Sequence, residues 1–180
     1  MKAWIALFRG INVGGNQKLP MKELRELLES IGCSDVTTYI QSGNAVFRSP
    51  VADASRLATR ISKAVATGHG FEPRVLVLSR DELQKAAAAN PFAKAAAAVP
   101  KSVHLFFLAS PPKSPNIESL ESVKAATEAF ALNGRTFYLH TPDGFGTSKL
   151  AERAERLLGV EATARNWRTV TTLLEMTTAS

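Results

Sequence analysis

Cysteine is almost absent from this sequence, since Cys33 is the only one in 180 residues. A single cysteine excludes an internal disulfide and any metal cluster built on several thiolates. Long apolar runs are absent as well, because no segment approaches the ~20 residues of a membrane-spanning helix. The first residues also lack the apolar core and cleavage site of a signal peptide. We therefore expect a cytoplasmic protein that does not associate with a membrane.

The residue patterns of common catalytic and metal sites are missing too. The histidines are scattered along the chain, and no cluster of histidines or carboxylates has the spacing of metal ligands. Ser42 lies in S-G-N rather than in the G-x-S-x-G turn that exposes a serine nucleophile. The sequence therefore predicts no metal site and no cofactor, and it singles out no catalytic residue.

Positive charge is in modest excess, because 22 Lys and Arg face 16 Asp and Glu and the formal net charge is +6. The basic residues alternate with acids in stretches such as KELRELLES and AERAERLLG, and they form no basic block. This distribution favours anionic partners slightly, but most of it is typical of a solvated surface.

Hydrophobic patterns in the first part of the chain predict the order strand, helix, strand, strand, helix, strand. Short apolar or β-branched runs predict strands at residues 4–8, 36–40, 45–48 and 73–78. Leucines at helical spacing follow Pro20, and Gly32 marks the end of that helix. Asp53 can cap a second helix, which we expect to stop at Gly68.

The same order recurs in the second part of the chain. Strands are predicted at residues 103–109, 127–132, 135–140 and 162–165, and helices at residues 117–125, 148–158 and 167–176. The pair Asn133-Gly134 is a strong hairpin signal. Ser79-x-x-Glu82 is a capping box that begins a connecting helix at about residue 80.

These patterns predict an α+β protein made of two tandem ferredoxin-like subdomains with a connecting helix and a C-terminal helix. Each subdomain is a βαββαβ unit, or α-β plait, with both helices on one face of a four-stranded antiparallel sheet. We place the first subdomain at residues 1–79, the connector with its helix at 80–101, and the second subdomain with the C-terminal helix at 102–180.

The stretch FRGINVGGNQK joins the first predicted strand to the first predicted helix. It fails both standard phosphate motifs, since Asn16 stands where a Walker A loop needs lysine and the G-x-G-x-x-G fingerprint is absent. A glycine-rich turn, a helix start and an arginine can nevertheless bind an anion together. The alternative is that the glycines only permit positive φ. The candidate anion ligands here are Arg9, Asn12, Gly14, Gly15 and Lys18.

The second candidate segment is TYIQSGNAVF, a predicted hairpin tip. Its Ser42 and Asn44 offer neutral hydrogen-bonding groups that could orient a ligand but could not transfer protons near neutral pH. An ordinary turn is the simpler interpretation of this segment.

The third candidate segment is TARNWRTVTTL, which crowds Arg165, Asn166 and Arg168 at a strand-to-helix junction. Two arginines beside a helix start can bind an anion, or they can pair with acids of the preceding helix. Lys149 also lies just inside a predicted helix start. A cation there is unfavourable for the helix dipole, which indicates an anionic partner.

Together these segments resemble the domain-of-unknown-function family 1697 of uncharacterised bacterial proteins. The resemblance rests on ALFRGINVGGNQKLPMKELRELLESIG, TYIQSGNAVF, NPF at residues 90–92, PDGFGTSKL and TARNWRTVTTLL. It implies two α/β-plait subdomains, in agreement with the patterns above. It implies no activity, ligand or catalytic residue.

Three functions are compatible with these observations. The first is a binding protein for a phosphate-bearing ligand, either a nucleotide or a nucleic acid, held at the Arg/Asn/Gly-rich loops. The second is a phosphoryl-group hydrolase, which rests only on the analogy of fold with acylphosphatases, whose motif the sequence does not match. The third is a scaffold or oligomerisation protein, in which the arginines form internal salt bridges.

Overall fold

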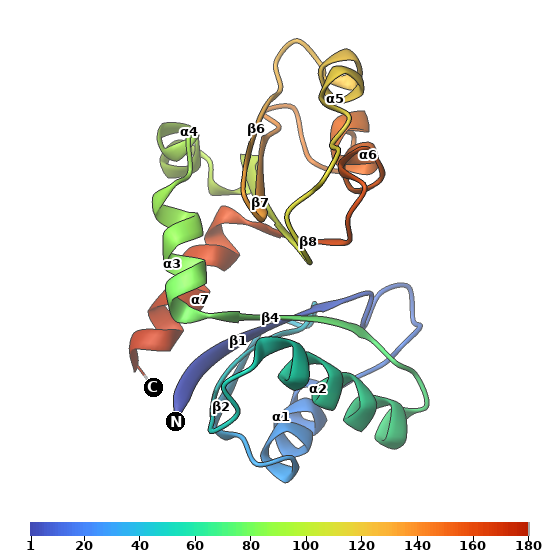
Figure 1. The fold of residues 1–180 in the computed structure, drawn as a ribbon, viewed down its shortest axis with the longest axis vertical. Helices are drawn as coiled ribbons and strands as arrows, with labels where there is room; N and C mark the ends of the chain where they lie inside the picture. Colours follow the sequence, from blue (N-terminus) through green and yellow to red (C-terminus); the bar gives the residue numbers. More distant parts are fainter. Residues whose placement is uncertain (180) are drawn as a thin grey trace. The chain divides into compact units, whose positions relative to one another are not determined.

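The computed structural model describes residues 1–179. They form two four-stranded antiparallel sheets, with the strand orders β2-β3-β1-β4 and β6-β7-β5-β8 (Figure 1). By Cα proximity the chain divides into two compact units, which we call the first unit and the second unit. The first unit contains Met1–Lys85 and the segment from Thr172 onward, and the second unit contains Ala86–Thr171.

The first unit has the predicted βαββαβ order. Its elements are β1 (Lys2–Arg9), α1 (Met21–Ser30), β2 (Ser34–Tyr39), β3 (Asn44–Ser49), α2 (Ala54–His69), β4 (Arg74–Ser79) and most of α3 (Arg80–Ala88). β1 lies between β3 and β4, and it pairs antiparallel with both. Both α1 and α2 lie on one face of this sheet (Figure 1).

The core of the first unit lies between this face and the two helices. Trp4, Ala6 and Phe8 alternate along β1 and pack there with the apolar sides of α1 and α2. Ile5 and Leu7 point to the opposite face and are fully buried as well. Because β1 is apolar on both faces, it appears in the sequence as a continuous run rather than an alternating one.

The second unit repeats the order with shorter helices. Its elements are the end of α3, α4 (Ala93–Ala98), the 3₁₀ turn η1 (Pro100–Ser102), β5 (Val103–Leu108), α5 (Ile117–Val123), β6 (Ala129–Asn133), β7 (Thr136–His140), α6 (Lys149–Leu158), β8 (Ala162–Asn166) and the start of α7 (Trp167–Ala179). Phe106 and Phe137 meet edge to face at 5.5 Å in its core, beneath α5 and α6. The fold predicted from the sequence is therefore confirmed.

Local capping signals account for most helix starts. Asp53 accepts the Arg56 N–H at 2.7 Å, and Ser79 and Glu82 form the reciprocal bonds of a capping box. Ser148 caps α6 in the same way as Asp53 caps α2.

Two local predictions were wrong. The helix α2 continues through Gly68 to His69 and ends at Gly70, whose φ of 75° supplies the left-handed cap. The hairpin turn falls on Gly134-Arg135, because Asn133 still pairs with Thr136. No helix among residues 1–179 is long and apolar enough to cross a bilayer.

Candidate functional site

The β1–α1 loop carries a tight two-residue turn at its tip. Val13 and Asn16 form an isolated antiparallel bridge around Gly14 and Gly15. These glycines have φ of 61° and 77°, which is the conformation that a type I′ turn requires at both central positions. Their presence is therefore explained by backbone geometry, although both remain exposed.

Asn12 joins the β1–α1 loop to the β2–β3 tip. Its Oδ1 accepts the Leu19 N–H at 2.8 Å, while its Nδ2 donates to the Leu19 carbonyl at 2.9 Å and to the Gln41 carbonyl at 2.8 Å. Both amide protons are used in these contacts. The structure therefore brings the first two candidate segments together, and it uses Asn12 as their clamp.

The β2–β3 tip is packed closely against the same loop. The Phe8 N–H donates to the Gly43 carbonyl at 2.9 Å, and a Cβ on Gly43 would lie 2.5 Å from Ile11 Cδ1. Asn44 is fully buried, and its Nδ2 donates to the Tyr39 carbonyl at 3.0 Å. Gly43 and Asn44 thus have structural roles in this tip.

The accessible candidates of the first unit lie around this clamp. Lys18 and Ser42 are exposed, and Arg9 pairs in register with Arg74 at the end of β1. The following helix begins after Pro20 without a side-chain cap. This end of the first unit therefore carries Arg9, Lys18 and Arg74, but its backbone is largely committed to the clamp.

The third candidate segment lies in the second unit. Asn166 caps α7, because its Oδ1 accepts the Thr169 N–H at 2.9 Å. Arg165 donates from Nη1 to the Ala164 carbonyl at 2.9 Å. Burial lowers the pKa of Arg165 to about 10, so it is still a cation at neutral pH. Arg168 is exposed on α7.

Lys149 lies in the same part of the second unit. It opens α6 and is exposed, and the loop before it is held by Phe145, which stacks on His104 at 3.8 Å. His104 pairs in register with Asn166 at the start of β5. The first-unit candidates lie instead where β1 ends. Because β1 and β5 have the same position in their sheets, the two groups of candidates lie at different ends of the βαββαβ unit to which each belongs.

No metal site or reactive thiol emerges within residues 1–179. No group of three or more histidine, cysteine, aspartate or glutamate side chains in this range could hold a metal ion. Cys33 is buried, and burial raises the pKa of its thiol, which disfavours the thiolate. Burial lowers the pKa of His104 to about 4, so its imidazole is neutral at physiological pH.

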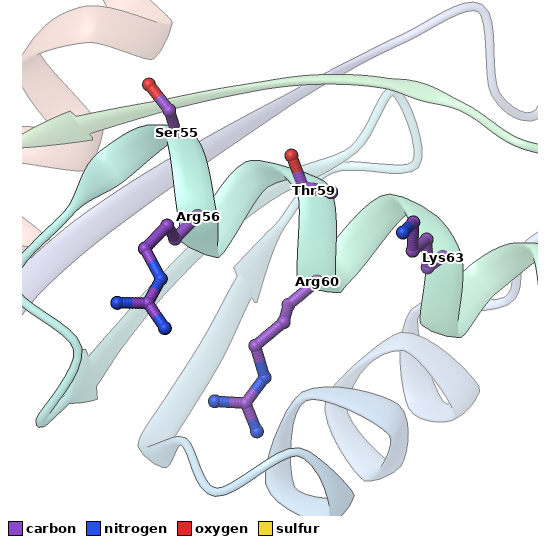
Figure 2. Close-up of a pocket in the computed structure, with 5 residues that line it drawn as sticks. All are labelled: Ser55, Arg56, Thr59, Arg60 and Lys63. Carbon is purple, nitrogen blue, oxygen red and sulfur yellow. The ribbon is translucent and has the colours of Figure 1, made fainter.

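A basic hollow on the outer side of α2 was not predicted from the sequence. It has a volume of about 370 Å³, and all of the side chains that line it come from this helix (Figure 2). The lining residues are Ser55, Arg56, Thr59, Arg60 and Lys63. The opposite side of α2 buries Leu57, Ile61 and Val65 in the core, which fixes the polar side outward.

The hollow combines cations with hydroxyl groups and contains no acid. Arg60 donates from Nη2 to the Ile31 carbonyl at 2.7 Å, which anchors its guanidinium. The side chains of Arg56 and Lys63 are exposed. Figure 2 shows the two guanidinium groups on one side of the helix and the Ser55 and Thr59 hydroxyls on the other. We call this cluster the α2 hollow.

A signal for the α2 hollow exists in the sequence. The cations are spaced at i, i+4 and i+7, which places them on one side of a helix. Residues 54–71 also contain no aspartate or glutamate. The even distribution of charge over the whole chain conceals this local excess.

Comparisons with known proteins agree with the fold. No curated protein matches the chain. The solved structure of the conserved bacterial protein SP0830 from Streptococcus pneumoniae is similar, with a TM-score of 0.67, 21% identity, and 98% of each chain covered. At this identity the similarity shows the fold alone. Residues 1–138 match the family described as "Protein of unknown function (DUF1697)".

This match includes FRGINVGGNQK, TYIQSGNAVF and the whole of α2, whereas TARNWRTVTTLL lies beyond the matched residues. The resemblance inferred from the sequence is confirmed. The chain belongs to the DUF1697 family.

Proposed function

We propose that the protein binds a phosphate-bearing ligand at the α2 hollow. The observation that supports this is a hollow whose lining residues include three cations and two hydroxyl-bearing residues, with no acidic side chain among them. A guanidinium presents a planar fork of donors that matches phosphate oxygens, while a lysine ammonium adds a mobile point charge.

The arrangement is unfavourable for the helix by itself. Arg56 and Arg60 are like charges at i, i+4 spacing, which destabilises a helix by about 0.2–0.5 kcal/mol per pair. Arg56 also lies in the first turn of α2, where the positive end of the dipole disfavours a cation. An anion in the α2 hollow would relieve both effects.

The clamped loops of the first unit are the second candidate location. Lys18 is exposed beside a helix start that has no side-chain cap, so an anion could reach the first amides of α1. The two locations share their ligand chemistry, and a pair of variants separates them.

Thermal unfolding with inorganic tripolyphosphate tests the proposal. At a concentration of about 100 Kd, binding adds about 2.7 kcal/mol to the stability of the protein. In a chain of this size that raises Tm by about 5–10 °C. The double variant Arg56→Ala/Lys63→Ala should lose most of this shift. Lys18→Ala and the matched control Arg153→Ala, an exposed cation on α6, should keep it.

The outcomes separate the two locations. Loss of the shift in Lys18→Ala alone would move the site to the clamped loops. An unchanged Tm of the wild-type protein at every tripolyphosphate concentration would reject the proposed function.

A further inference from the structure

We infer that the ligand of the α2 hollow is a nucleic-acid strand, which is contacted through its phosphates and without regard to base sequence. This inference rests on the proposed function, because it specifies which phosphate-bearing ligand the same residues bind.

The spacing of the cations supports a ligand with repeated phosphates. Arg56, Arg60 and Lys63 follow one another along the exposed side of α2. Because a helix rises about 1.5 Å per residue, the seven steps from Arg56 to Lys63 cover about 10 Å. Successive phosphates on one strand of a duplex are about 3.4 Å apart along the axis. The row of cations therefore covers about three phosphate-to-phosphate steps, which is long enough for each of the three cations to contact a separate phosphate.

The walls of the hollow disfavour a single nucleotide. Small-ligand pockets enclose most of the ligand between apolar or aromatic surfaces. Here all the lining side chains belong to one helix, and none of them is aromatic (Figure 2). A base would find neither a ring for stacking nor a second wall. The contacts are therefore limited to phosphate and sugar, which carry no sequence information.

The charge around α2 also suits a long polyanion. The acids nearest in sequence are Asp53 and Glu72, and Asp53 already accepts the Arg56 N–H as the helix cap. Between them the Lys and Arg side chains of α2 have no acid on the same helix, and Glu23 of α1 lies 3.5 Å from His69 at the last residue of α2. The formal net charge of +6 adds a favourable long-range field for a polyanion.

Fluorescence anisotropy with labelled DNA duplexes of two lengths and two unrelated sequences tests the inference. Each phosphate contact on duplex DNA contributes about −0.9 to the slope of log K against log salt. Three contacts give a slope of about −2.7, so affinity should fall about 40-fold between about 50 and about 200 mM salt. In Arg56→Ala/Lys63→Ala one contact is left, and the fall should be only about 3.5-fold.

The controls use the same assay. Arg153→Ala removes one exposed cation from α6 and should keep the wild-type slope. Both sequences should bind equally, and the longer duplex should bind more tightly because it offers more overlapping sites. Arg60 is left unchanged, because it also bonds the Ile31 carbonyl and its loss could weaken the fold.

Three results would overturn the inference. A thermal shift with tripolyphosphate but no binding of either duplex would restrict the ligand to a small phosphate compound and leave the proposed function intact. A salt slope that is the same in the wild type and in the double variant would place the nucleic acid elsewhere on the protein. Binding of neither probe would reject the inference and the proposed function together.

Discussion

The two units share one strand order but differ in the helix that follows their central hairpin. In the first unit this helix is α2, which has 16 residues, three Lys or Arg and no acid. In the second unit it is α6, which has 10 residues and alternates glutamates with arginines. Both bury an apolar side and cap their first turn with a side chain. The βαββαβ fold therefore does not require a basic helix, and the charge of α2 needs another explanation.

The units also differ at the hairpin tip. In the first unit Gly43 packs against Phe8 and Ile11, and Asn12 ties the tip to the β1–α1 loop. In the second unit Gly134 has open space around it. The tip of the first unit is thus packed and clamped by side chains, while the tip of the second unit leaves Gly134 uncrowded. That tip is held to the end of β5 by Arg135, whose Nε donates to the Leu108 carbonyl at 3.1 Å and whose carbonyl accepts the Leu108 N–H at 2.9 Å.

The largest effect is expected from Gly43→Ala. A Cβ there would overlap Ile11 and Phe8 at a φ of 87°, which combines overpacking with a left-handed backbone. We expect a loss of about 2–5 kcal/mol in the free energy of unfolding, measured by urea denaturation. The matched change Gly134→Ala should cost only about 1–2 kcal/mol, since its φ is 56° and no atom lies nearby. Equal losses would contradict this contrast.

Asn12→Ala should follow. The substitution leaves the Leu19 amide and the Leu19 and Gln41 carbonyls without their partner, and it places alanine at a φ of 55°. We expect a loss of about 2–4 kcal/mol by the same measurement. The Asn116 Oδ1 caps α5 by accepting the Ser119 N–H. Asn116→Ala removes only this cap and should lower the free energy of unfolding by about 1 kcal/mol. A smaller loss for Asn12→Ala than for Asn116→Ala would show that the clamp does not stabilise the first unit.

A pH effect should arise from the second unit, because β5 contains the partly buried His104. Its pKa is about 4 in the folded protein and 6.5 when unperturbed, so the unfolded state binds the extra proton between these values. The contribution of neutral His104 to the free energy of unfolding is therefore fully present above pH 6.5. It falls by up to about 3 kcal/mol as the pH approaches 4. His104→Phe, which keeps a ring beside Phe145, should remove this part of the pH dependence. If the free energy of unfolding had the same pH dependence in the wild type and in His104→Phe, this prediction would be wrong.

The smallest effect on stability is expected where the largest effect on binding is proposed. Arg56→Ala and Lys63→Ala change exposed side chains of α2, and each should alter the free energy of unfolding by less than about 0.5 kcal/mol. The corresponding change on α6, Arg153→Ala, should alter the free energy of unfolding equally little. A clear destabilisation in either α2 variant would indicate that these cations serve the fold.

The elements could be predicted because their signals are local. Asp53, the Ser79–Glu82 pair and Gly159 each act within a few residues of a helix end, and they appear in the structure as expected. The end of α2 was misplaced because Gly68 and Gly70 are equivalent in sequence, and only the left-handed φ of Gly70 distinguishes them.

The candidate site was less accessible to sequence reasoning. The polar loops contain the residue types of an anion site, and the sequence therefore predicted ligands there. Asn12 instead bonds the Gln41 carbonyl, 29 residues away, and no local pattern reveals this structural role. The cations of α2 contribute to the net charge of the whole chain, and that total does not reveal a local cluster. Their i, i+4 and i+7 spacing places them on one side of the helix, and the burial of Leu57 and Ile61 directs that side outward.

The terminal helix α7 has a consequence for the order in which the chain can fold. Its first residues belong to the second unit, while the residues from Thr172 onward belong to the first. The first unit is therefore complete only after the 86 residues from Ala86 to Thr171 have been made. At about 5–20 residues per second, translation delays that closure by about 4–17 s. A nascent chain paused within β8 would have all four strands of the first unit's sheet, but its closing segment would not yet be synthesised.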